Sequence, residues 1–120
     1  MNTIQIILVG LVAFLHFYFM ILEMFYWTKP KGQKAFGLTP EFAEETKVLG
    51  ANQGLYNGFL SAGLVWSLID SHYGYQIAIF FLSCVIIAGI YGAYSTKKIK
   101  LFYIQSVPAI LAFILTVIQY

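Results

Sequence analysis

Two side chains that can exchange protons, His16 and Glu23, lie inside one long apolar stretch at residues 4–27. They are seven positions apart, so on a helix they share a face and lie about 10 Å apart along its axis. Ionisable groups inside a membrane span are costly, usually face the protein interior and often mark function. This pair could act as general acid and base, or bind a polar ligand.

Three amides are the natural partners of that carboxylate. Asn52, Gln53 and Asn57 lie in a second apolar stretch, and Gln53 and Asn57 are four positions apart on one helical face. No lysine or arginine lies within the apolar stretches, so Glu23 needs hydrogen bonds, water or a bound proton to offset its burial. We therefore predict a polar ligand-binding pocket that opens toward the cytoplasmic side. Its expected residues are His16, Glu23, Trp27, Asn52, Gln53 and Asn57.

A second interpretation gives the same polar groups a structural role. Small residues recur at every fourth position, at Gly50, Gly54, Gly58 and Ala62, and form a groove that another helix backbone can approach closely. Amides that hydrogen-bond between helices, worth about 0.6–2 kcal/mol each, would lock such packing. The sequence leaves three functions open: binding or moving a small molecule, a structural or interaction role that includes a homo-oligomer, and a membrane enzyme that uses the acid–base pair.

A metal centre is a further alternative. His16, Met20 and Met24 follow one another at intervals of four, and imidazole with thioether sulfur suits Cu(I) or a haem iron. Methionines are also ordinary packing residues, and the chain has no paired histidine or cysteine motif. We expect no metal and no cofactor.

The composition indicates where these residues lie. Of the 120 residues, 60% are hydrophobic and 10% are charged, against about 25% charged in globular domains. We predict an integral membrane protein with a single domain, residues 1–120. Four apolar stretches favour an all-α bundle of four transmembrane helices that run up-down-up-down. Their ranges are about 4–27, 51–69, 75–95 and 101–119.

Two local signals refine this architecture. Thr39-Pro40-Glu41 is typical of a helix start, with an N-cap, a proline in the first turn and an acidic residue. It predicts a short amphipathic helix at about 40–49, between the first two spans. Pro108 cannot donate a backbone hydrogen bond to Ile104, which predicts a kink in the fourth helix.

All seven basic residues are lysines, and they lie in two loops at residues 28–50 and 96–100. Two helices separate these loops, so both lie on one side of the membrane, which the positive-inside rule makes cytoplasmic. We expect a multi-pass protein of the bacterial cytoplasmic (inner) membrane with both termini extracytoplasmic. The expected partners are the lipid bilayer and a small-molecule ligand, and no nucleic acid.

The order of these residues is similar to a known family. His16, then Glu23-Met24 and Trp27, then a basic loop and the stretch ANQGLYNGFL at 51–60, resembles a bacterial membrane-protein family catalogued as domain of unknown function 1304. Ala62-Gly63-Leu64 continues the pattern, and the resemblance covers essentially the whole chain. It implies a small four-helix membrane protein and brings no established activity.

Overall fold

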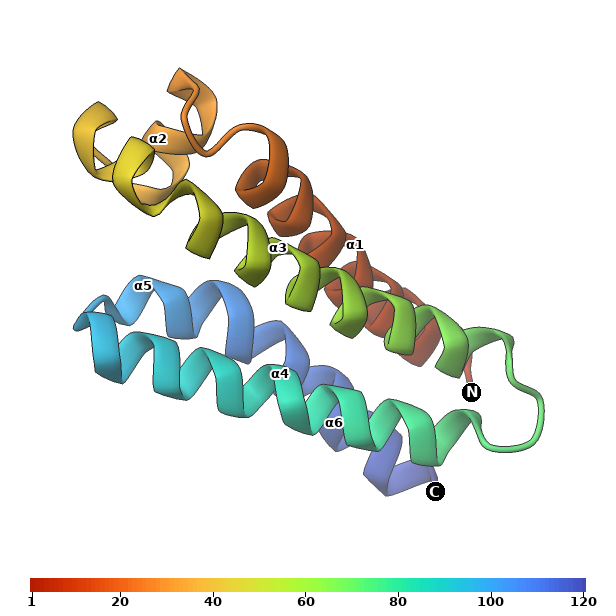
Figure 1. Ribbon diagram of the computed structural model, residues 1–120. Coiled ribbons are helices and arrows are strands. Elements are labelled where there is room, and N and C mark those ends of the chain that lie inside the picture. Colours follow the sequence, from red (N-terminus) through yellow and green to blue (C-terminus); the bar gives the residue numbers. More distant parts are fainter. The chain divides into compact units, whose positions relative to one another are not determined.

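The computed structural model describes all 120 residues and is helical, with no strand (Figure 1). The helices are α1 (Thr3–Phe25), α2 (Pro30–Phe36), α3 (Pro40–Ile69), α4 (Gly74–Thr96), α5 (Ile99–Leu101), the π-helical turn η1 (Phe102–Ser106) and α6 (Val107–Gln119). The chain divides into two compact units. Unit 1 comprises Met1–Phe14 and Leu60–Tyr120, and unit 2 comprises Leu15–Phe59.

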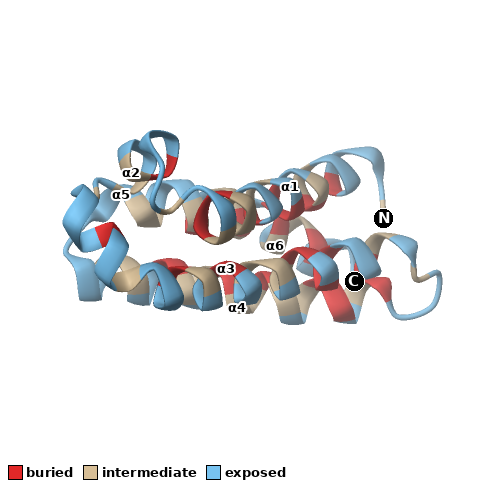
Figure 2. Cartoon of the chain, turned by 45° about the horizontal axis from the view of Figure 1, so that its top comes forward, coloured by how far each residue is buried: buried red, intermediate tan, exposed pale blue.

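Three helical runs are long and apolar enough to cross a membrane, which indicates a membrane protein: Thr3–Phe25, Gly74–Thr96 and Ile99–Gln119. Exposed residues continue along the whole length of these helices (Figure 2), and many of them are large and apolar, as expected of surfaces that face lipid. The fourth expected span, residues 51–69, is not among the three. Its amides, at positions 52, 53 and 57, reduce its apolar character.

A reciprocal cap sets the start of α1. The side-chain oxygen of Asn2 accepts the backbone N–H of Gln5, and the side-chain oxygen of Gln5 accepts the N–H of Asn2, both at 2.9 Å. This capping box uses N–H groups that the start of a helix would otherwise leave without partners. The helix therefore begins at Thr3, close to the start of the first apolar stretch.

One continuous helix, α3, covers both the expected short helix at 40–49 and the second apolar stretch. Its start is capped by Thr39, whose Oγ1 accepts the N–H of Phe42 at 3.1 Å. Gly50 lies at the expected boundary but does not end the helix, because an interior glycine costs only about 1 kcal/mol. The change from charged to apolar composition at this point is therefore not a break in the backbone.

Helix α2 lies within residues 28–50, which the lysine pattern predicts to be a loop. Pro30 occupies its first turn, and Gly37 follows its last residue with a left-handed backbone, φ 65°. Proline at the start and glycine just past the end are recognised helix signals. They were missed because seven residues carry too little apolar periodicity to stand out.

The last apolar run is interrupted by a π-helical turn. The sequence predicts a kink at Pro108, and the structure places η1 directly before the first turn of α6, which contains this proline. Since Pro108 has no N–H to give to Ile104, the regular hydrogen-bond ladder cannot continue through this point. A π-helical turn is one known way of accommodating such a break.

Asp70 organises the turn between α3 and α4. One of its carboxylate oxygens accepts the backbone N–H of Tyr73 at 2.6 Å and that of His72 at 2.9 Å. These bonds, the one from Tyr73 first, lower the pKa of Asp70 below its ordinary value. Asp70 therefore keeps its charge, and with it these bonds, to a lower pH than a free aspartate would.

The core of unit 1 is built from small and aliphatic side chains, which let helices approach closely. Its buried members are Val9, Val12, Ala13, Leu64, Ala78, Leu82, Val85, Ala109 and Ala112. Within this unit α4 and α6 lie side by side (Figure 1). Ser106 Oγ donates to the carbonyl of Ile86 at 3.1 Å, and a Cβ on Gly89 would lie 2.0 Å from that hydroxyl oxygen.

We expect Gly89→Ala to destabilise the protein by about 1–3 kcal/mol, because the new methyl group must displace Ser106. Gly92→Ala is the matched control on the same helix, since a Cβ there meets nothing within 4 Å, and it should be neutral or stabilising. Thermal unfolding in detergent measures both. Equal effects of the two substitutions would show that the close approach at Gly89 is not required.

Candidate functional site

In unit 2 the second half of α1 and the first part of α3 run antiparallel, side by side (Figure 1). The register is set by glycines of α3, each of which faces a large side chain of α1. Gly50 faces Trp27, Gly54 faces Met24 and Glu23, and Gly58 faces Met20. A Cβ on Gly54 would lie 2.7 Å from Met24 Cγ, and one on Gly58 would lie 2.6 Å from Met20 Sδ. A larger residue would force these methionine side chains to move, and at position 54 it would also crowd Glu23 Cβ at 3.0 Å.

This register buries Glu23 against α3. The residue is 1% exposed, and its two carboxylate oxygens accept hydrogen bonds from the side-chain amides of Gln53 and Asn57, one each. The structure thus brings together three of the residues that the sequence analysis grouped into a site. Each oxygen can accept a further hydrogen bond, so the two amides do not exhaust the carboxylate.

A cavity of about 360 Å³ opens beside this carboxylate, at the end of α1 and the start of α3. Its lining residues are Glu23, Met24, Phe25, Trp27, Thr28, Lys47, Val48, Ala51 and Asn52. This volume lies in the range of roughly 300–1,000 Å³ that is typical of ligand pockets. The wall combines a carboxylate, an ammonium, an amide and a hydroxyl with apolar surface, so it can both accept and donate hydrogen bonds.

Trp27 fixes the end of the site where α1 stops. Its indole Nε1 donates to Thr46 Oγ1 at 3.1 Å, and the Thr46 hydroxyl donates to the carbonyl of Phe42 at 2.7 Å. Its ring lies 5.4 Å from the ring of Phe36 in α2, centre to centre, and lies against Gly50. Trp27 therefore connects α1, α2 and α3 within unit 2.

The cavity includes residues that the sequence analysis did not select. Lys47 and Thr28 are among the lining residues, and Thr46 accepts a hydrogen bond from Trp27. Lys47 also pairs with Glu44 at 2.5 Å, an exposed pair on α3. No spacing signal pointed to Lys47, because a residue five positions before Asn52 lies on a different face of a helix.

His16 has a different position from the one expected. It is fully buried, and its ring meets that of Phe19 edge-on at 5.4 Å, but it is not among the residues that line the cavity. Asn52 lines the cavity without bonding to Glu23.

The methionines of the metal alternative, Met20 and Met24, lie against the glycines of α3. No group of three or more His, Cys, Asp or Glu side chains could hold a metal ion.

The chain is similar in sequence to other proteins. Residues 10–117 match the model of a family described as "Protein of unknown function (DUF1304)". The chain is 34% identical, over 116 residues, to "Uncharacterized protein YpaA" of Lactococcus lactis subsp. lactis (strain IL1403), a match that covers 95% of this chain and 97% of that protein. No solved structure matches.

We expect Asn57→Leu to destabilise unit 2 by about 1–3 kcal/mol, because it leaves one oxygen of a buried carboxylate without its donor. Asn52→Leu is the matched control: it is the same substitution on the same helix, at an exposed amide that does not bond to Glu23, and it should cost less than about 0.5 kcal/mol. Unfolding in detergent distinguishes the two, and equal losses would contradict this role for Asn57.

Proposed function

This chain belongs to the family described as "Protein of unknown function (DUF1304)", so membership assigns no activity, and we propose one from its own geometry. The protein binds a small polar molecule in the cavity of unit 2, with the Glu23 carboxylate as the principal acceptor. The observation that carries this proposal is that Glu23, a buried acid held by two amides, is one of the residues that line the cavity.

The chemistry of the wall favours an amine as the ligand. Glu23 has acceptor capacity beyond the bonds from Gln53 and Asn57, and hydrogen bonds to a charged group are stronger than neutral ones. The apolar surfaces of Met24 and Trp27 would contact the carbon skeleton of such a molecule. Lys47 and Asn52 would donate hydrogen bonds to an acceptor group at the other end of the ligand.

A structural function is the second candidate, and a specific observation favours it. Both oxygens of Glu23 already accept an amide hydrogen bond from α3, so the cluster can hold two helices together without any ligand. An acid–base enzyme finds less support, because His16 does not line the cavity beside Glu23.

A screen of small amines separates the two candidates. An amine that binds should raise the unfolding temperature of the purified protein in detergent. At a hundred times its Kd, the gain in the free energy of unfolding is about 2.7 kcal/mol. Glu23→Gln should abolish that rise, while Glu41→Gln, at an exposed carboxylate outside the cavity, should retain it. The corresponding alcohols serve as neutral probes of the same size.

Two outcomes of this screen would contradict the binding proposal. If no amine in the panel stabilises the wild type, or if Glu23→Gln responds as the wild type does, the binding proposal fails. A large loss of stability in Glu23→Gln without any ligand response would instead support the structural role.

We also propose how the chain crosses the membrane. Residues 51–69 of α3 form a fourth span despite their amides, because Glu23 satisfies two of these amides within the protein. Four crossings give an up-down-up-down bundle in the bacterial inner membrane. They place the lysines of 28–50 and 96–100 on the cytoplasmic side and both termini outside.

Cysteine labelling tests this topology. In a Cys84→Ser background, an impermeant maleimide added to intact cells should label Asn2→Cys, and should label Lys100→Cys only after the membrane is permeabilised. Labelling of position 100 in intact cells, with position 2 protected, would reverse the orientation. Labelling of both positions from the same side would contradict the fourth span, because the proposal puts three crossings between them.

A further inference from the structure

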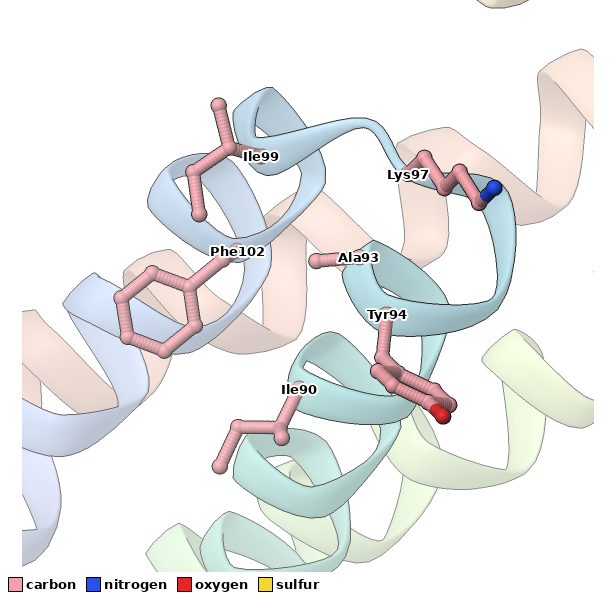
Figure 3. A pocket seen from close by; sticks show the side chains of 6 residues that line it. All are labelled: Ile90, Ala93, Tyr94, Lys97, Ile99 and Phe102. Atoms are coloured by element: carbon pink, nitrogen blue, oxygen red, sulfur yellow. The ribbon is translucent and has the colours of Figure 1, made fainter.

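Unit 1 contains a second hollow, well separated in the sequence from the Glu23 cavity. It measures about 460 Å³ and lies where α4 turns into α5. Figure 3 shows Ile90, Ala93 and Tyr94 of α4 on one side, and Ile99 and Phe102 on the other, with Lys97 on the turn that joins them. This hollow is a mainly apolar groove whose lining also includes one lysine and one tyrosine.

The backbone of the turn sets the position of Lys97. Lys97 has a left-handed conformation, φ 59°, and is the one non-glycine residue of the chain with a positive φ. It ends α4 and lets α5 begin at Ile99, two residues later. The tight turn keeps Ile99 and Phe102 opposite α4, so the groove is a built feature of the connection.

The charged side chains in the part of the chain that forms the groove are all positive. Residues 71–120 contain three lysines, at positions 97, 98 and 100, and no aspartate or glutamate. The Lys97 side chain is exposed and forms no ion pair within the chain. An anion that reaches the groove can therefore meet a lysine that has no carboxylate partner.

The position of the turn indicates what that anion is. The helical runs on either side of it, Gly74–Thr96 and Ile99–Gln119, are both long and apolar enough to cross a membrane. The turn that connects two such runs lies at the level of the lipid headgroups, where lysines attract anionic lipids. The apolar walls suit a hydrocarbon chain, and a lysine at headgroup level suits a phosphate. A phospholipid carries both groups in this order.

We propose that this groove binds an anionic phospholipid, with an acyl chain against Ile90, Ile99 and Phe102 and the headgroup phosphate facing Lys97. A zwitterionic lipid would fill the apolar part equally well but carries no net negative charge. A free phosphate would meet the lysine but leave the apolar walls uncovered. The site is independent of the Glu23 cavity, so it stands whether or not that cavity binds an amine.

Native mass spectrometry of the detergent-purified protein tests the proposal. The probes are phosphatidylglycerol and phosphatidylcholine with identical palmitoyl and oleoyl chains, added at equal concentration. We expect phosphatidylglycerol to be retained preferentially. Lys97→Gln should lower that preference about fivefold, the factor that one lysine contributes near an anionic lipid surface.

Two variants and one soluble probe sharpen the result. Lys34→Gln removes the same charge at an exposed lysine outside the groove, and should change the preference less than twofold. Ile99→Ser, at an exposed position, should reduce retention of both lipids. Glycerol phosphate should not displace phosphatidylglycerol. Unchanged unfolding temperatures identify variants that are correctly folded.

Each contrary outcome overturns the proposal. Equal retention of the two lipids would show that the groove does not select a negatively charged headgroup. Equal effects of Lys97→Gln and Lys34→Gln would reduce the site to diffuse charge. Retention unaffected by Ile99→Ser would exclude the acyl-chain contact, and displacement by glycerol phosphate would make the site one for a soluble anion.

Discussion

A carboxylate buried inside an apolar helix must be met by hydrogen-bond donors from another part of the protein, and the structure of unit 2 follows from this constraint. Glu23 is 1% exposed and receives one amide from each of two residues on α3. Side chains as short as those of asparagine and glutamine reach it only if the two helices lie very close. The glycines at 54 and 58 permit that approach, because a Cβ at either position would overlap the methionines of α1. The amides and the glycines are therefore parts of one arrangement, and neither would be useful without the other.

Much of this arrangement could be predicted from the sequence. A buried acid without a nearby cation requires amide donors, and Gln53 and Asn57 have the spacing to present two of them on one face. Helix α1 is also visible in the sequence, since its apolar stretch is long and its cap is local. The family membership was predicted as well and is confirmed by the match over residues 10–117.

Other features depend on contacts that no local pattern records. Hydropathy changes at Gly50, which suggested two elements, but the backbone hydrogen bonds of α3 continue because nothing in its sequence removes an N–H. Pro108 indicated an irregular helix, yet the form of the irregularity, a π-helical turn with Ser106 packed on Gly89, depends on the neighbouring helix. Lys47 and Asn52 line one cavity on a single helix, because α3 continues without a break between them.

The left-handed backbone of Lys97 has a consequence for how this chain can change. Glycine adopts that conformation without strain, whereas a residue with a side chain loses about 1–2 kcal/mol there. Replacing Lys97 by glycine would therefore relax the turn and at the same time remove the cation from the edge of the groove. At this position a residue that makes the fold more stable also removes the positive charge. A variant selected only for heat resistance is expected to lose the lysine, and one selected in a membrane rich in anionic lipid is expected to keep it.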